Sequence, residues 1–193
     1  MEAERADLRP WRRLFHAGNG LVISFLPPLL GVDTRTVVLM LSALLVVLMA
    51  GDIVRLRSPK LNETFFALFP SFASTRERTH VASSTWYLLG AILVLALFPA
   101  RLAVPAIVVL ALADPAASIV GRLWGRRKLG KGSVLGTSVF VVVAAAVLSA
   151  FFPVPVAVAA AVVVAAVEIL PWRVDDNLSV PLAAAAALWL LGA

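Results

Sequence analysis

The chain has 193 residues, of which 61% are hydrophobic and only 15% charged, and its mean hydropathy is +0.96. Because soluble domains are near half apolar and a quarter charged, this composition indicates a protein that folds in lipid. The absence of cysteine excludes disulfides and thiolate chemistry, and two histidines, His16 and His80, are too few for a histidine metal centre. The net charge of +6 does not predict nucleic-acid binding, since the basic residues are interleaved with hydrophobic stretches, which is a topology signal.

About seven apolar stretches predict an all-α, polytopic membrane helical bundle that forms one domain over residues 1–193. The first span is short and contains Pro27 and Pro28, so we expect it to be kinked or only partly inserted. The fifth and sixth spans are joined by Pro153-Val154-Pro155, which predicts an antiparallel hairpin. In chain order the predicted spans are 18–31, 36–53, 84–99, 102–121, 134–152, 154–170 and 179–192.

Two features of these elements leave alternatives open. The segment Phe65–Phe72, in the long connection 54–83, is too short to span and lies either at the membrane interface or in a re-entrant or packed loop. The alanine-rich fifth and sixth helices allow close packing, either within one chain or in a homo-oligomer.

The distribution of basic residues predicts a cytoplasmic N-terminus. With that orientation, all of the 17 Lys and Arg residues except Arg35 and Arg101 lie on the cytoplasmic side. The residues on that side are Arg5, Arg9, Arg12, Arg13, Arg55, Arg57, Lys60, Arg76, Arg78, Arg122, Arg126, Arg127, Lys128, Lys131 and Arg173.

Asp114 is an acidic residue inside the predicted fourth span, about 10 Å below the helix end at Gly121. Carboxylates inside a membrane usually face a protein interior or a water-filled cavity and are functional. The structural alternative is an N-cap, since Asp114 is followed by Pro115. The two interpretations are compatible, because a helix broken at that depth is tolerated beside a cavity.

Glu168, Asp175, Asp176 and Asn177 follow near the cytoplasmic end of the sixth span and before the seventh. Their oxygens, together with those of Asp114, are hard ligands suited to Mg²⁺. The alternative for part of this group is a capping role, with Asp176 or Asn177 at the start of the last helix.

Residues 121–137 combine five glycines with five basic residues. Glycines let backbone N–H groups approach phosphate oxygens, which Arg and Lys neutralise, and Ser133 and Thr137 can add hydrogen bonds at a helix start. By itself such a segment is also typical of a basic loop with turn glycines. Beside carboxylates suited to Mg²⁺, it favours phosphoryl or nucleotidyl transfer.

Three elements of the sequence resemble the CTP-dependent lipid kinases, the polyprenol kinase family that includes dolichol kinase, phytol kinase and the eukaryotic-type diacylglycerol kinase. Asp114-Pro-Ala-Ala117 with Gly121-Arg122 and Gly125 resembles the D-x-x-A-x-x-x-G-R-x-x-G signature. Ser133-x-x-Gly136-Thr137 with Phe140 resembles K-S/T-x-x-G-S/T, although Gly132 replaces the lysine, Lys131 lies one position earlier, and Leu135 replaces an acid. Glu168 with Asp176-Asn177-Leu178-x-x-Pro181-Leu182 resembles E…D-N-L-x-x-P-L.

The resemblance implies transfer of the γ-phosphoryl group of CTP to the hydroxyl of a membrane lipid alcohol such as a polyprenol, a phytol-like alcohol or diacylglycerol. It implies Asp114, Glu168 and Asp176 as catalytic residues and ligands of Mg²⁺. Asp114 and Asp176 would hold the ion, or one of them would orient the hydroxyl as base, and Glu168 is the next candidate for either role. It implies an active site on the cytoplasmic face of the membrane, the plasma membrane in a prokaryote. The nucleotide would be bound by Gly121, Arg122, Gly125, Arg127, Lys131, Ser133, Gly136, Thr137 and Asn177.

Three alternatives remain at this stage. A CTP:phosphatidate cytidylyltransferase would use the same groups. A transporter would use Asp114 and Glu168 as proton or cation sites, but no repeat of the helices is present and the acids lie near one face. A purely structural membrane protein would not need Asp114.

Overall fold

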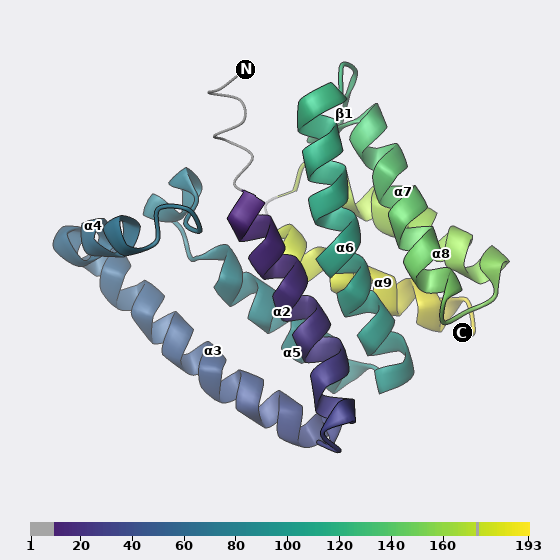
Figure 1. The fold of residues 1–193 in the computed structure, drawn as a ribbon, viewed down its shortest axis with the longest axis horizontal. Coiled ribbons are helices and arrows are strands. Elements are labelled where there is room, and N and C mark those ends of the chain that lie inside the picture. The colour runs from purple at the N-terminus through teal and green to yellow at the C-terminus, as the bar shows by residue number, and fades with distance from the viewer. Residues whose placement is uncertain (1–9, 173) are drawn as a thin grey trace.

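A computed structural model describes residues 10–172 and 174–193 (Figure 1). Within these residues the chain is almost entirely helical, with a 3-10 helix and a two-stranded antiparallel hairpin as the other elements. The elements are α2 (Pro10–Leu29), α3 (Thr34–Arg57), α4 (Pro59–Leu68), η1 (Thr75–Arg78), α5 (Ser83–Leu97), α6 (Ala100–Trp124), β1 (Lys128–Leu129), β2 (Gly132–Ser133), α7 (Val134–Ser149), α8 (Val154–Glu168) and α9 (Asp176–Leu190). The all-helical bundle predicted from the sequence is therefore confirmed.

Each predicted span falls on one long helix, with the largest difference at the first. Helix α2 begins at Pro10 rather than at residue 18, because its first turns are basic and carry no hydropathy signal although they continue the same helix. Pro27 and Pro28 lie inside its last turns, where each has carbonyl groups of the preceding turn as neighbours but no N–H to donate.

Crossing of the membrane by all seven long helices is not confirmed. Two helices of the described chain, α3 and α6, are long and apolar enough to cross a membrane. Helices α5, α7, α8 and α9 are apolar but have only 15 or 16 residues. At 1.5 Å per residue this is about 23 Å, less than the roughly 30 Å of a bilayer's hydrocarbon core.

The connection between α3 and α5 is folded against the helices. Ser58 caps α4, and the phenylalanine-rich segment starts within α4 and continues past its end. The Phe65 ring lies under the Arg55 guanidinium, with 4.8 Å between the guanidinium carbon and the ring centroid, and Phe72 meets Phe15 of α2 edge to face at 5.6 Å. The segment thus contacts the helices through Phe65 and Phe72, while residues 67–72 are exposed, and its place at the membrane interface stays a prediction.

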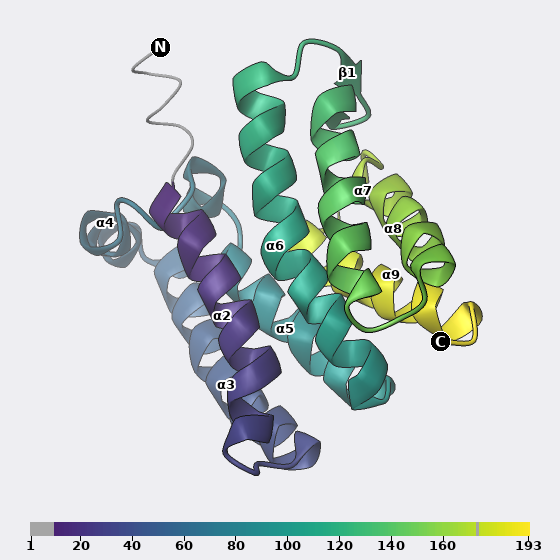
Figure 2. The same cartoon turned by 45° about the vertical axis from the view of Figure 1, so that its right-hand side comes forward.

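Helix α6 is the centre of the bundle. Its buried residues include Leu102, Ala106 and Ile107, none of which has any exposed surface, and α2, α5, α7 and α9 pack against it. Helix α9 runs behind α6 and α7 and crosses them (Figures 1 and 2). Helix α3 lies at the edge, packed on α5, with most of its apolar surface uncovered.

The predicted hairpin of the fifth and sixth spans is formed by α7 and α8, which lie side by side (Figure 2). Ala144 of α7 and Ala157, Ala160 and Ala161 of α8 are fully buried in the core of the single chain. The close packing that alanine allows is thus used within the chain in this structure.

Candidate active site

The three carboxylates singled out in the sequence come together. Asp114 projects from α6, Glu168 is the last residue of α8, and Asp176 is the first residue of α9. One carboxylate oxygen of each lies within 4.8 Å of those of the other two, and all three side chains are partly buried. Residues separated by up to 62 positions in the sequence (176 minus 114) therefore form one acidic cluster.

Helix α6 passes through Asp114 and Pro115 without a break, so the alternative in which Asp114 is an N-cap is wrong. Pro115 removes one N–H from the helix, which leaves the carbonyl of Ala111 without its usual helical partner, yet the helix continues to Trp124. The carbonyl of Pro115 accepts a hydrogen bond from Nη1 of Arg13 in α2 at 3.3 Å. This contact fixes α2 against the part of α6 that carries Asp114.

The start of α9 shows which acid is the cap. Asp175 is the N-cap, and its Oδ1 accepts from the backbone N–H of Asn177 at 3.2 Å. The predicted capping role of Asp176 or Asn177 is therefore wrong, since the cap lies one or two positions earlier. Since Asp175 satisfies the helix end, the carboxylate of Asp176 is left for the acidic cluster. The Asn177 amide donates to the Ser83 carbonyl of α5 at 3.3 Å and to Asp175 at 2.9 Å.

A glycine of α5 permits this position of α9. A Cβ on Gly90 would lie 2.2 Å from the carbonyl oxygen of Asn177, closer than any real contact. The backbone of α5 therefore touches the first turn of α9 directly, and Gly90 sets how near Asp176 comes to the other two carboxylates.

The basic segment after α6 folds as a short hairpin, in which Lys128 and Leu129 pair with Ser133 and Gly132. Its turn uses Gly130 in the left-handed region, with φ +53°, and a Cβ there would collide with the Ile169 carbonyl. That carbonyl accepts from the Lys131 N–H at 3.2 Å, so the turn is attached to the end of α8.

The attachment of the turn brings Lys131 to the acidic cluster, where its ammonium group forms an ion pair with Asp176. The carboxyl of Asp176 lies outside the predicted span at 179–192. Burial raises the pKa of this carboxyl above the ordinary value, and the hydrogen bond and charge of Lys131 oppose that rise. A cation beside three carboxylates is one way to lower the repulsion among them.

The other residues of the predicted phosphate segment lie in the contact between α6 and α7. Gly121 and Gly136 approach so closely that a Cβ on Gly121 would lie 3.3 Å from the Gly136 Cα, and a Cβ on Gly125 would overlap the Ser133 hydroxyl. Ser133 is buried and caps α7 by accepting from the Gly136 N–H at 3.1 Å. In this structure the three glycines thus allow the close approach of two helices.

Thr137, Arg122 and Arg127 complete the predicted set. The Thr137 hydroxyl, in the first turn of α7, is buried and has no hydrogen-bond partner among the described residues. Arg122 is exposed in the last turn of α6, and Arg127 is exposed just before the hairpin, where its carbonyl accepts from the Val134 N–H. Arg5, Arg9 and Arg173, used for the orientation, lie outside the described residues.

One buried ion pair was not foreseen from the sequence. Asp52 and Arg55 of α3 form a buried pair at 2.7 Å, and Asp52 also accepts from the Ala82 N–H and the Thr85 hydroxyl. Arg55 donates to the carbonyl of Glu77 at 2.7 Å, which holds the loop after α4. The spacing of an acid and an arginine by three positions at the end of an apolar helix was the available signal.

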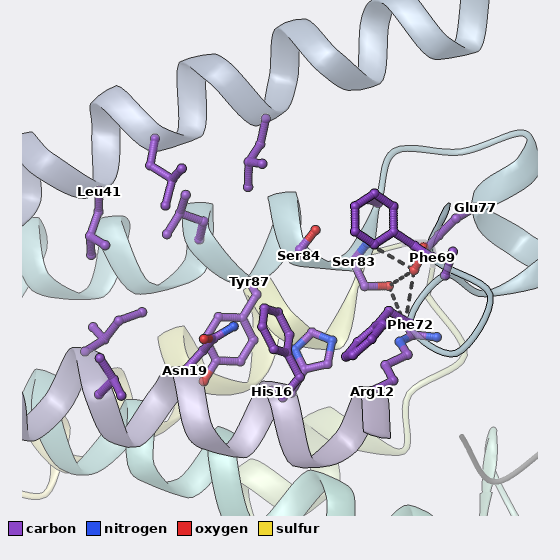
Figure 3. A pocket seen from close by; sticks show the side chains of 18 of the residues that line it. Arg12, His16, Asn19, Leu41, Phe69, Phe72, Glu77, Ser83, Ser84 and Tyr87 are labelled. Carbon is purple, nitrogen blue, oxygen red and sulfur yellow. Dashed lines mark hydrogen bonds and ion pairs between the residues drawn. The ribbon is translucent and has the colours of Figure 1, made fainter. Parts of the chain in front are cut away.

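A second polar group joins α2, η1 and α5. Nη2 of Arg12 donates to the Ser83 hydroxyl at 2.6 Å and lies 3.3 Å from a Glu77 carboxylate oxygen, and Ser83 donates to Glu77 at 2.9 Å (Figure 3). Glu77 was also missed, although Ser74 three positions earlier matches the capping-box pattern that the structure contains.

The chain was compared with protein families, curated proteins and solved structures. No protein-family model, no curated protein and no solved structure matches this chain. The chemistry of the site therefore rests on its own residues. Three oxygen ligands within 4.8 Å suit a hard divalent cation such as Mg²⁺, and the adjacent Lys131 supplies a positive charge for an anion.

Proposed function

We propose that this chain is a membrane-embedded lipid kinase that transfers the γ-phosphoryl group of a nucleoside triphosphate, CTP by resemblance, to the hydroxyl of a membrane lipid alcohol. The observation that carries the proposal is the cluster of Asp114, Glu168 and Asp176 with Lys131 beside it. Phosphoryl transfer needs little covalent chemistry from the protein and depends on cation ligands and positive charges that hold the phosphates.

The cluster fits a magnesium site by the chemistry of its donors. Asp114, Glu168 and Asp176 would hold the ion, which neutralises charge on the phosphates when bound. Mg²⁺ keeps several waters and commonly takes few protein carboxylates, so not every member of the cluster needs to be a ligand. One carboxylate is then left to orient the hydroxyl and accept its proton.

In the proposed reaction the γ-phosphoryl group passes from the nucleotide directly to the lipid hydroxyl. The lipid hydroxyl oxygen attacks the γ-phosphorus, the bond between that phosphorus and the β–γ bridging oxygen breaks, and CDP leaves. The hydroxyl proton passes to one carboxylate of the cluster. Lys131 is placed to meet the phosphate oxygens, and Arg122 and Arg127 extend the positive charge at the same end of α6.

A small cavity near the start of α9, lined by both polar and apolar side chains, offers space for the nucleotide. It has a volume of about 330 Å³ and is lined by Arg76, His80, Trp86 and Asp175, among others. Asp175 directly precedes Asp176 of the cluster, and Trp86 offers a ring that a base can stack against. We therefore place the base and ribose of the nucleotide in this cavity.

The membrane location is part of the proposal, with seven crossings and the N-terminus in the cytoplasm. Its support is the apolar surface that the fold leaves uncovered. On α3 alone, Leu39, Met40, Val46 and Val47 are each more than 60% exposed. Contiguous apolar surface of this kind is unfavourable in water and is expected where lipid surrounds a helix. The short helices would then cross where the bilayer is locally thinned.

The test is turnover by the purified protein in detergent with radiolabelled CTP, Mg²⁺ and a panel of lipid alcohols. Asp114→Asn is expected to lower turnover by about 100-fold or more, since it removes an ion ligand or the proton acceptor. Asp33→Asn is the matched control, because Asp33 is an exposed cap of α3 and asparagine also caps helices. Full turnover by the Asp114 variant would refute the role given to the cluster.

The products of the reaction separate the proposal from its alternatives. Release of CDP with a phosphorylated lipid identifies a kinase, whereas release of pyrophosphate identifies a cytidylyltransferase. Nucleotide-independent flux of protons or cations into liposomes would instead favour a transporter.

A further inference from the structure

A large apolar cavity lies between α2 and α3, outside the acidic cluster. Its volume is about 630 Å³, which is within the range of pockets that hold small ligands. Figure 3 shows side chains of α2 and α3 facing each other across it, with α5 beside them. The lining of the cavity includes aliphatic side chains such as Val22, Ile23 and Leu44. The polar side chains of His16, Asn19 and Tyr87 lie between Leu41 and Arg12 (Figure 3).

The cavity exists because the two helices on either side pack on different partners. Helix α2 is held on α6, where Gly20 lets the Tyr87 hydroxyl and Ala111 come close, and α3 is held on α5. Apolar side chains that line the space, including Val22 at 53% and Leu44 at 48% exposure, remain uncovered. A hydrocarbon chain would fill the space beside them and gain van der Waals contacts that an empty space forfeits.

One end of the cavity is aromatic and charged. Phe69 and Phe72 lie there beside Arg12 and Glu77, as Figure 3 shows. Glu77 is buried and satisfied by Ser83 and Arg12, so the charge of this end is balanced. Both contacts of Arg12 use Nη2, and a guanidinium has five N–H donors, so the group keeps donors for a polar ligand.

This polar end is connected to the acidic cluster by two contacts. Ser83, which lines the cavity, accepts from the Asn177 amide next to Asp176. Arg13, adjacent to Arg12 in α2, donates to the carbonyl of Pro115 next to Asp114. A ligand whose chain fills the aliphatic part therefore has its polar end on the side of the molecule where the carboxylates lie.

We propose that this cavity holds the hydrocarbon chain of a single-chain lipid alcohol, with its hydroxyl beyond Arg12 and Ser83, at the end that Asn177 connects to the acidic cluster. The inference rests on the proposed function for the identity of the lipid as the phosphoryl acceptor. The occupant is a hydrocarbon chain because the lining is aliphatic and aromatic, and it ends in a hydroxyl because the polar end is charge-balanced and offers both donors and acceptors.

Binding is tested without nucleotide, by photolabelling the full chain with a long-chain alcohol that carries a diazirine on its chain. We expect labelled peptides from α2 and α3, with residues around Leu41 and Leu44, and competition by unlabelled alcohol rather than by an alkane of equal length. Labelling confined to the outer face of α3, around Leu39 and Val46, would overturn the inference.

Leu41→Trp narrows the cavity and is expected to weaken labelling about tenfold, as the loss of one or two buried methylenes would. Leu39→Trp is the matched control, since Leu39 is 63% exposed on the same helix and does not line the cavity. Leu41→Ala widens the cavity and tests it independently if Leu41→Trp fails to fold. This variant is expected to favour bulkier chains. Equal labelling of all three variants and the native chain would overturn the inference.

Turnover separates this inference from the proposed function. Labelling in the cavity without any phosphorylated product would support the lipid site and contradict the proposed kinase function. Phosphorylation of alcohols with an unchanged chain-length preference in Leu41→Trp and Leu41→Ala would contradict lipid binding in the cavity and support the proposed kinase function.

Discussion

At the scale of single residues, the buried acids described by the structure differ in how far neighbouring groups compensate their charge. Asp52 binds Arg55, Ala82 and Thr85, and it is buried as part of the fold. Asp114, Glu168 and Asp176 lie together, and Lys131 is the counter-charge at Asp176. Like charges held at such distances repel one another, so a bound cation would stabilise a cluster of this kind.

Lys131→Gln tests whether the lysine of the hairpin serves the nucleotide. We expect the KM for CTP to rise about tenfold or more, since a charge-assisted contact to phosphate is lost, while affinity for Mn²⁺ does not fall, because the carboxylates remain. Steady-state kinetics and Mn²⁺ binding measure the two effects.

Lys128→Gln is the control for that experiment, because Lys128 is an exposed residue of the same hairpin. An equal rise of KM in both variants would mean that only the overall positive charge of the hairpin matters.

At the scale of elements, the position of each site residue depends on how a helix starts or ends. Asp175 caps α9 and leaves Asp176 for the cluster, and Ser133 caps α7 immediately after the hairpin. Glycines then decide how closely the elements approach, at Gly90 between α5 and α9 and at Gly121 between α6 and α7.

Gly90→Ala is expected to move the start of α9 and separate Asp176 from its neighbours, because the new Cβ would overlap the Asn177 carbonyl. We expect a loss of about 1–3 kcal/mol in the free energy of unfolding together with a marked loss of turnover. Thermal melting in detergent and the turnover assay measure these.

The matched control is Gly51→Ala in α3, where nothing lies within 4 Å of the added carbon. There alanine is expected to be neutral or to stabilise the helix by up to about 1 kcal/mol. Full activity of Gly90→Ala would show that α9 is not held by this contact.

Asp52→Asn tests the buried pair that holds the loop after α4. Removal of one charge leaves Arg55 buried and uncompensated, so the free energy of unfolding is expected to fall by about 3–5 kcal/mol. The midpoint of thermal unfolding in detergent measures the change. Asp33→Asn, at the exposed start of the same helix, should unfold like the native protein, and equal stability of both variants would contradict the role of the pair.

At the scale of the whole molecule, the fold combines a compact bundle around α6 with an edge formed by α2 and α3. The compact part carries the acidic cluster, and the edge leaves the apolar cavity between its helices. This division would allow the proposed reaction site and the proposed lipid site to coexist in a small chain, with Ser83 and α2 between them.

The proposed topology is testable with single cysteines, because the native chain has none. A membrane-impermeant maleimide added to intact cells is expected to label Arg35→Cys and not Lys128→Cys, which becomes reactive only after the membrane is opened. Both native side chains are exposed, so access within the protein does not limit the reaction. Labelling of Lys128→Cys from outside, or of neither variant after lysis, would contradict the seven-crossing arrangement.

The sequence by itself determined the helical class and the approximate place of each long helix, because burial of apolar stretches in helices depends on composition and local periodicity. It also singled out Asp114 and Glu168 as candidates, since acids in apolar surroundings are costly and therefore conspicuous, and Asp176 through its oxygen-ligand chemistry and its resemblance to a family element. Only the tertiary structure decided that these three meet, that Asp175 rather than Asp176 is the cap, and that Gly121 and Gly136 bring helices together. Those outcomes depend on contacts between residues far apart in the chain, and local pattern carries no information about which distant backbone or charge a side chain will face.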